Sequence, residues 1–117
     1  MAVKKTELAA RLQHACACVT AAEDTLTQID SKFGDADHGL TMTKIAGAIS
    51  QAVEEAEDGI QSMLDDAAMA VMVLNGGSAV PLWNTWLDGM QEAAPAGEDI
   101  DVAGLQAMFA QGFKALD

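Results

Sequence analysis

Apolar residues recur at every third or fourth position over most of this chain, which is the spacing of one face of an α-helix. The first stripe predicts a helix over residues 6 to 30, with Thr6 as an N-terminal signal. Its inward positions are Leu8, Leu12, Ala15, Cys16, Val19, Ala22, Leu26 and Ile29. A second helix is predicted to follow Thr41 as its capping residue. Its inward positions are Met42, Ile45, Ala46, Ile49, Ala52 and Val53.

The second half of the chain continues the same pattern. A third helix is predicted to begin at about Ile60. Pro81 is predicted to lie in the first turn of a fourth helix, where proline is tolerated because a backbone N–H has no helical partner there. A polar connector over 93–101 precedes Asp101, a capping residue for the last helix. The bulky positions of the last two helices are Leu82, Trp83, Trp86, Leu87, Met90, Leu105, Met108, Phe109, Phe113 and Leu116. About five amphipathic helices predict an all-α antiparallel bundle, and 117 residues predict a single domain over 1–117.

Composition and charge restrict the class of partner. Apolar residues make up 50% of the chain and charged residues 21%, as in soluble globular proteins. The net charge of −12, with six basic residues, argues against nucleic acid, because those cations could not neutralise a phosphate backbone. It also argues against anionic membrane surfaces. No signal peptide or long uncharged apolar run is present, so the sequence predicts a cytoplasmic protein with reduced cysteines.

Three residues of the first predicted helix are of types that ligate metals: His14, Cys16 and Cys18. Cys16 and Cys18 are two positions apart, and side chains at that spacing diverge on a helix, so we expect no disulfide between them. Helical spacing is also expected to scatter the three side chains. We therefore interpret them as packing residues rather than as a metal site.

Three carboxylates lie within eight positions between the first two predicted helices: Asp30, Asp35 and Asp37. Gly34 and Gly39 bracket the last two and let the backbone turn through positive φ. Like charges this close repel, and a hard divalent cation relieves the repulsion because carboxylate oxygens suit Mg²⁺ or Ca²⁺. Solvated carboxylates in an Asx-type turn are the alternative. We favour the metal interpretation, although no EF-hand is possible because the glutamate it requires at its twelfth position is missing.

A second glycine-rich turn, Gly76-Gly77-Ser78, precedes the fourth predicted helix. Alternate loops of an up-down bundle lie at the same end, so we expect this turn beside the acidic one. Glycines before a helix N-terminus expose N–H groups that hold phosphate, and Ser78 adds a hydroxyl. One loop would then hold the metal ion and the other the phosphate, as Mg²⁺-dependent phosphoryl transfer requires. The three residues fit a helix C-cap followed by an N-cap equally well, and both interpretations stay open.

These motifs resemble a known family. Ile29-Asp30, followed by Gly34-Asp35-Ala36-Asp37-His38-Gly39-Leu40-Thr41-Met42, is similar to the signature of the ADP-binding L subunit of dihydroxyacetone kinase. Gly76-Gly77-Ser78-Ala79-Val80-Pro81-Leu82 stands at a separation similar to that of the family's second glycine-rich turn. Ala79 and Val80 differ from the serine and glycine that are usual there. The resemblance covers this whole chain but about the N-terminal half of the family module.

The resemblance implies an α-helical barrel that binds ADP or ATP through two Mg²⁺ ions. It implies that Asp30, Asp35 and Asp37 hold the ions and that His38 and Thr41 lie beside the phosphates. We expect His38 to act on the phosphate side or behind the ligands rather than as a direct ligand. The turn Gly76-Gly77-Ser78 would contact the phosphates.

The resemblance also implies partner chains. A separate K-type subunit binds dihydroxyacetone covalently, so the L-type chain needs no nucleophile and we assign it no catalytic residue of its own. In one branch of the family a phosphotransferase-system protein recharges the bound ADP, and in the other branch ATP exchanges freely. The leading hypothesis is thus a Mg²⁺-dependent, nucleotide-binding phosphoryl-transfer component of a dihydroxyacetone-kinase-like system.

The alternative hypothesis is a truncated, non-catalytic helical module that dimerises or regulates a partner. Under either hypothesis, an open five-helix array leaves an apolar face uncovered. We therefore expect self-association or a further chain that supplies the missing half of the module.

Overall fold

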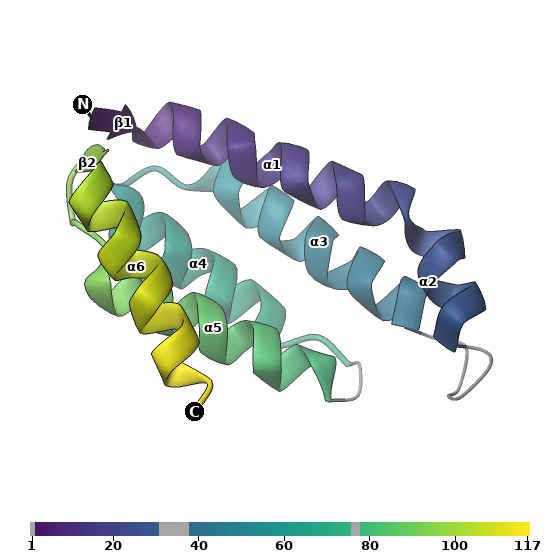
Figure 1. Cartoon of the computed structure of the whole chain (residues 1–117). Coiled ribbons are helices and arrows are strands. Elements are labelled where there is room, and N and C mark those ends of the chain that lie inside the picture. Colours follow the sequence, from purple (N-terminus) through teal and green to yellow (C-terminus); the bar gives the residue numbers. More distant parts are fainter. Residues whose placement is uncertain (1, 31–37, 76–77) are drawn as a thin grey trace.

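The computed structural model of this chain describes residues 2–30, 38–75 and 78–117. The described part forms six helices and one two-stranded sheet (Figure 1). In chain order the elements are β1 (Ala2–Lys4), α1 (Lys5–Ala21), α2 (Glu23–Asp30), α3 (His38–Glu55), α4 (Ile60–Met72), α5 (Ala79–Ala93), β2 (Asp99–Asp101) and α6 (Val102–Ala115). The all-α prediction is therefore confirmed. Within these residues no helix has the length and apolar character needed to cross a membrane.

Successive helices pack against each other, with α1, α2 and α3 on one side of the molecule and α4, α5 and α6 on the other (Figure 1). The middle of the bundle, where α3, α4 and α5 meet, contains most of the core. Burying a large apolar side chain there contributes about 1.5–3 kcal/mol. The largest fully buried side chains are Ile45, Ile60, Met63, Leu64, Val71, Leu87, Met90 and Met108.

The single helix predicted over residues 6 to 30 is interrupted at Ala22, where α1 ends and α2 begins. Ala22 has φ −91° and ψ 6°, which leaves the regular helix. Glu23 and Asp24 then lie in the first turn of α2, where the helix dipole favours negative charge. The break changes the direction of the apolar stripe, so Ile29, predicted to face inward, is 59% exposed. No glycine or proline stands at or next to Ala22. The apolar periodicity of the sequence therefore continues through the break and predicts a single helix.

The first helix begins one residue before the predicted start, whereas the predicted threonine cap of the second helix is wrong. Helix α1 begins at Lys5, directly after β1, so Thr6 is inside the helix. Helix α3 begins at His38, which places Thr41 within its first turn rather than at its cap. One threonine in the sequence does not determine the residue at which a helix begins, because an adjoining strand or turn can start the helix earlier.

Two other helix-start predictions are confirmed. Pro81 lies in the first turn of α5, where its missing N–H leaves no intrahelical bond unmade. Asp101 precedes α6 in an extended conformation, and its Oδ1 accepts the N–H of Gly104 at 2.7 Å. This bond satisfies one of the amide groups that the first turn leaves without a helical partner.

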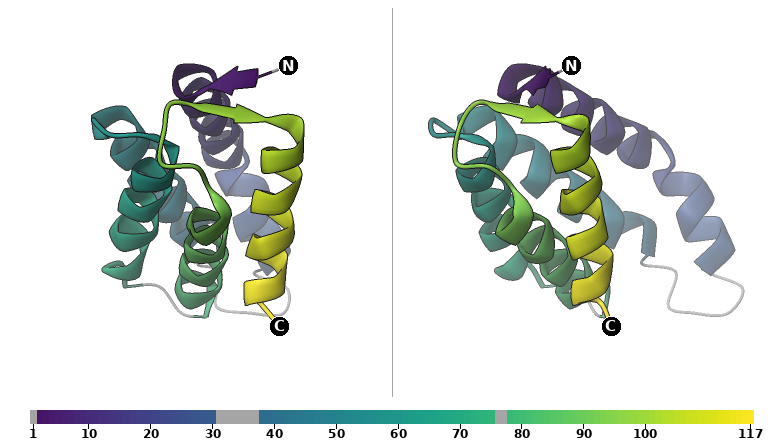
Figure 2. Two further views of the ribbon diagram at one scale, coloured as in Figure 1. Left: turned by 90° about the vertical axis from the view of Figure 1, so that its left-hand side faces the viewer. Right: turned by 60° about the vertical axis from the view of Figure 1, so that its left-hand side comes forward.

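The two short strands join the beginning of the chain to the beginning of α6 (Figure 2). They pair antiparallel with Val3 opposite Ile100, and Ile100 is buried. Just beyond β1, the N–H of Lys5 donates to the carbonyl of Glu98 at 2.6 Å, and Lys5 Nζ donates to the carbonyl of Ala56 at 2.9 Å. Strands of three residues are too short for an alternating pattern to identify them, so the sequence did not predict this sheet.

Helices α5 and α6 approach each other most closely at two glycines, Gly89 and Gly112. A Cβ atom on Gly89 would lie 2.6 Å from the Cβ of Ala115 and 2.9 Å from the carbonyl oxygen of Gln111. A Cβ atom on Gly112 would lie 2.9 Å from the ring of Trp86. The absence of side chains at these two positions therefore sets the distance between the helices.

We predict that Gly89→Ala lowers the free energy of unfolding by about 1–3 kcal/mol, because the added methyl group overpacks the α5–α6 contact. Gly47→Ala is the matched control, since Gly47 is exposed within α3 and has no neighbouring atom in the space of a Cβ. The control should stabilise the protein by about 0.5–1 kcal/mol, because glycine disfavours helix interiors. Urea denaturation followed by circular dichroism measures both. Equal effects of the two substitutions would contradict the packing argument.

Candidate functional site

The candidate site is the end of the bundle where α2 ends and α3 and α5 begin. Asp30 is the last residue of α2, His38 is the first of α3, and Ser78 directly precedes α5. The remaining candidates, Asp35, Asp37, Gly76 and Gly77, lie outside the described residues, as does the side chain of Asp30. Assignment of the three aspartates as metal ligands therefore stays a prediction.

Three helix termini come together at this end. Figures 1 and 2 place the end of α2, the beginning of α3 and the beginning of α5 on the same side of the bundle, away from the β1–β2 sheet. Helices α3 and α5 also contact each other directly. Both have their N-termini at the candidate site, and a helix N-terminus carries a partial positive charge. The helices that flank the two predicted loops therefore have their ends on one side of the bundle, whereas residues 31–37 and 76–77 lie outside the described residues.

The first turn of α3 is fixed against α2 by Gly39. This glycine is buried, and a Cβ on it would collide with the carbonyl oxygen of Glu23 and the hydroxyl of Thr27. Gly39 is predicted from the sequence to lie in a turn with positive φ, and this prediction is wrong, because Gly39 lies in α3 and has no left-handed backbone. Its role is to let α3 approach the backbone of α2, so that the chain segments on either side of the acidic stretch are held together.

Two candidate nucleotide-binding residues lie on this first turn. The side chain of His38 is exposed and that of Thr41 is half-buried. Residues on the first turn of a helix are suitably placed for a ligand at its N-terminus, where the amide groups point outward. The position of both residues is compatible with contact to a bound phosphate. Contact itself stays a prediction.

Ser78 does not use its side chain as a helix cap. It precedes α5 with φ −76° and ψ −15°, and its hydroxyl makes no capping hydrogen bond. An N-cap residue normally has extended backbone angles and accepts an N–H of the first turn. The capping interpretation of Ser78 therefore loses its support, whereas Ser78 as a phosphate donor is still a prediction.

Negative charge dominates the sequence around this end. Residues 23–37 contain five carboxylates, Glu23, Asp24, Asp30, Asp35 and Asp37, and one basic residue, Lys32. A helix N-terminus supplies the equivalent of roughly half a positive charge, so two of them cannot balance this excess. An anionic ligand at this end therefore needs cations bound with it. Carboxylate oxygens are the donors that Mg²⁺ prefers, so the residue types present fit that ion.

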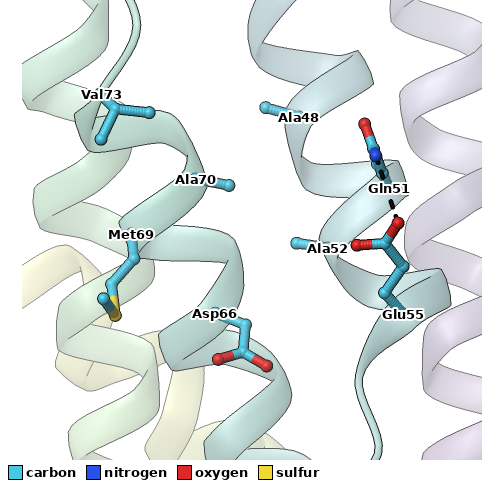
Figure 3. Close-up of a pocket in the computed structure, with 8 residues that line it drawn as sticks. All are labelled: Ala48, Gln51, Ala52, Glu55, Asp66, Met69, Ala70 and Val73. Carbon is cyan, nitrogen blue, oxygen red and sulfur yellow. Dashed lines mark hydrogen bonds between the residues drawn. The ribbon is translucent and has the colours of Figure 1, made fainter.

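A groove between α3 and α4 is a further concave surface among the described residues (Figure 3). It has a volume of about 610 Å³, and its floor is formed by small side chains such as Ala48, Ala52 and Ala70. Its charged lining residues are Glu55 and Asp66, and Gln51 Nε2 donates to Glu55 Oε1 at 3.2 Å. Without a basic residue in its lining, this groove does not fit a phosphate group.

Two positioning residues were missed by the sequence analysis. Asn84 Nδ2 donates to the carbonyl of Ala68 at 2.7 Å and so joins α5 to α4 two turns behind the site. Thr27 lies on α2 directly beneath Gly39. Asn84 could have been identified from the sequence as a positioning residue, because it is the single side-chain amide within the apolar run Pro81–Leu87. Nothing in the local sequence pairs Thr27 with Gly39, because that contact is between helices.

Comparisons with known proteins agree with this architecture. A sequence model of the DAK2 domain matches residues 32–117. The chain is 28% identical over 116 residues to the ADP-binding subunit DhaL of the PEP-dependent dihydroxyacetone kinase of Escherichia coli (strain K12), covering 96% of this chain and 54% of that protein. It is 28% identical over 93 residues to the ADP-binding subunit DhaL of PEP-dependent dihydroxyacetone kinase 1 of Listeria innocua serovar 6a, covering 79% of this chain and 46% of that protein. The chain spans about half the length of these curated relatives.

We predict that Gly39→Ala destabilises the protein by about 1–3 kcal/mol, because α2 must move away from α3 to admit the methyl group. Thr27→Ala should not rescue it, since the carbonyl of Glu23 still occupies the same space. Amide chemical shifts in α2 and the first turn of α3 should change, while those of α6 should not. Urea denaturation and two-dimensional NMR test this. Rescue by Thr27→Ala would show that the hydroxyl, and not the backbone, is the obstacle.

Proposed function

This chain belongs to the DAK2 domain family, and from that membership we propose that it is the nucleotide-binding, Mg²⁺-dependent phosphoryl-transfer component of a dihydroxyacetone-kinase-like system. ADP or ATP binds at the end of the bundle where α3 and α5 begin. The observation that carries the proposal is that α3 and α5 begin at the same end of the bundle, while the sequence that leads into α3 is strongly acidic. Helix N-termini favour phosphate, whereas clustered carboxylates favour divalent cations, and a Mg²⁺-nucleotide needs both.

Each candidate residue has a role in this proposal. Asp30, Asp35 and Asp37 hold Mg²⁺, which neutralises phosphate charge when bound. His38 and Thr41, on the first turn of α3, lie on the phosphate side. The turn formed by Gly76, Gly77 and Ser78 offers backbone N–H groups and one hydroxyl to the phosphates. Gly39 positions the acidic segment by fixing α3 against α2.

Partner chains complete the proposed reaction. The two curated relatives are named as subunits of PEP-dependent kinases, and this chain spans about half of their length. The acceptor is a small hydroxyketone held by a K-type subunit, and the phosphoryl group comes from ATP or from a phosphotransferase-system protein. No residue of this chain acts as a nucleophile. Its contribution is to bind, orient and electrostatically stabilise the nucleotide.

We predict that isothermal titration calorimetry of the protein with ADP shows micromolar binding in the presence of Mg²⁺ and none in the presence of EDTA. The double substitution Asp35→Asn/Asp37→Asn should weaken this binding by more than about tenfold, because the ion loses two of its ligands.

The matched control is Glu54→Gln/Glu57→Gln, which removes the same amount of negative charge from exposed positions at and just beyond the opposite end of α3. It should leave ADP affinity unchanged within about twofold, since charges this far away are screened. Equal losses in the two double variants would indicate a general charge effect. No binding of Mg²⁺-ADP, with or without a K-type subunit, would favour the truncated, non-catalytic module instead.

The expected association with another chain has a candidate surface on α5 and α6. An apolar groove of about 240 Å³ lies between them, lined by Leu82, Trp83, Trp86, Phe113 and Leu116. Leu82 is 56% exposed and Phe113 is 62% exposed. The two tryptophan rings are T-shaped with centroids 5.4 Å apart, so the groove has a rigid aromatic floor. We infer that this face packs against a second copy of the chain or a chain that supplies the remaining half of the module.

We predict that the purified chain sediments as more than its monomer mass of 12.2 kDa at micromolar concentration. Leu82→Ser/Phe113→Ser should return it to a monomer without changing its helical circular dichroism, because both side chains are mostly exposed. Met69→Ser/Val73→Ser removes exposed apolar groups from α4 and its C-cap instead and should leave the association intact. A wild-type chain that is monomeric at every concentration would contradict association with a second copy.

A further inference from the structure

Two side chains on the outward face of α1 meet outside the nucleotide site. Cys18 Sγ lies 3.7 Å from His14 Nε2, and both residues are exposed. The sequence analysis expected helical spacing to separate His14 from the cysteines, and for Cys18 this was wrong. Positions four apart lie on the same face of a helix, one turn above each other. Cys16, two positions from each, is buried in the core.

The separation of the two atoms matches what a chelated metal ion requires. Zn²⁺ binds thiolate sulfur at about 2.3 Å and imidazole nitrogen at about 2.0–2.1 Å, and its angles are near tetrahedral. These values place the sulfur and nitrogen about 3.6 Å apart when both bind one ion. The observed 3.7 Å therefore needs a small rotation of the imidazole and no movement of α1.

The ligand types of this pair favour a different ion from the one that the carboxylates of the acidic turn favour. A thiolate together with an imidazole suits Zn²⁺ and similar transition metals, whereas carboxylates suit Mg²⁺. Cys16 does not compete for the ion, because its side chain is buried in the core rather than on the outward face of α1.

The surface around the pair leaves room for the other ligands of the ion. Its neighbours on the helix, Ala15 and Ala17, are exposed and small. No group of three or more potential ligands occurs among the described residues, so this part of the chain supplies two ligands. Water completes the tetrahedron, which leaves the ion open to exchange. The net charge of −12 favours cations near the surface, although Arg11 is one turn before His14.

We propose that His14 and Cys18 form a surface site for Zn²⁺ or a similar transition-metal ion, with His14 Nε2 and Cys18 Sγ as its two protein ligands. On binding, the thiol S–H bond breaks, the sulfur binds the ion and the proton passes to the solvent. No oxidation or reduction takes place. This site is distinct from the proposed nucleotide site, because it lies in the second half of α1 rather than at the end of α2, and because the nucleotide site uses oxygen ligands.

Titration of the purified chain with Co²⁺ tests the proposal, because a thiolate bound to Co²⁺ gives a charge-transfer absorption that oxygen ligands do not give. We expect this band to appear, to disappear when Zn²⁺ is added in competition, and to be unaffected by excess Mg²⁺. About one proton should be released for each ion bound. Cys18→Ser should abolish the band, whereas Cys16→Ala should keep it.

The spacing is tested by moving the histidine. His14→Ala should weaken Zn²⁺ affinity by more than about tenfold, since one of two protein ligands is lost. The double substitution His14→Ala/Ala17→His restores the composition but places the imidazole next to Cys18 in sequence, where neighbouring side chains diverge. It should bind as weakly as His14→Ala. Full affinity in this relocated variant, a band that survives in Cys18→Ser, or no band with excess Co²⁺ would overturn the proposal.

Discussion

The structure depends on the antiparallel packing of α3, α4 and α5 around one apolar core. The buried side chains of these three helices fix their relative direction, with α6 closing on α5 through paired glycines. Because α4 runs back between α3 and α5, the N-termini of α3 and α5 must point to the same end. The positive ends of two helix dipoles at that end are thus a consequence of core packing. The site uses a charge distribution that the fold would create in any case.

The acidic segment is the counterpart of those two N-termini. Residues 23–37 carry five carboxylates, and the close contact of Gly39 with α2 holds the helices on both sides of the segment together. In the proposed function, helix N-termini favour the phosphate groups and carboxylates favour Mg²⁺. Under that proposal, a chain with net charge −12 binds a nucleotide together with its cation.

Two other surfaces depend less on how the core packs. The groove between α5 and α6 keeps aromatic and aliphatic side chains exposed, because the apolar stripe of α6 is wider than its contact with α5. The outward face of α1 carries a histidine and a cysteine at helical spacing. The chain spans about half the length of its curated relatives, and this apolar face is exposed among the described residues.

The sequence by itself determined the helical class, the starts of α4, α5 and α6, and the candidate ligands, because periodicity, proline and capping aspartate act within a few residues. It also supplied the family likeness, through the acidic motif. Tertiary structure decided what depends on other helices: the break at Ala22, the role of Gly39 against the backbone of α2, and the exposure of Phe113. Contacts between segments far apart in the chain leave no local pattern, since each depends on which partner the core brings alongside.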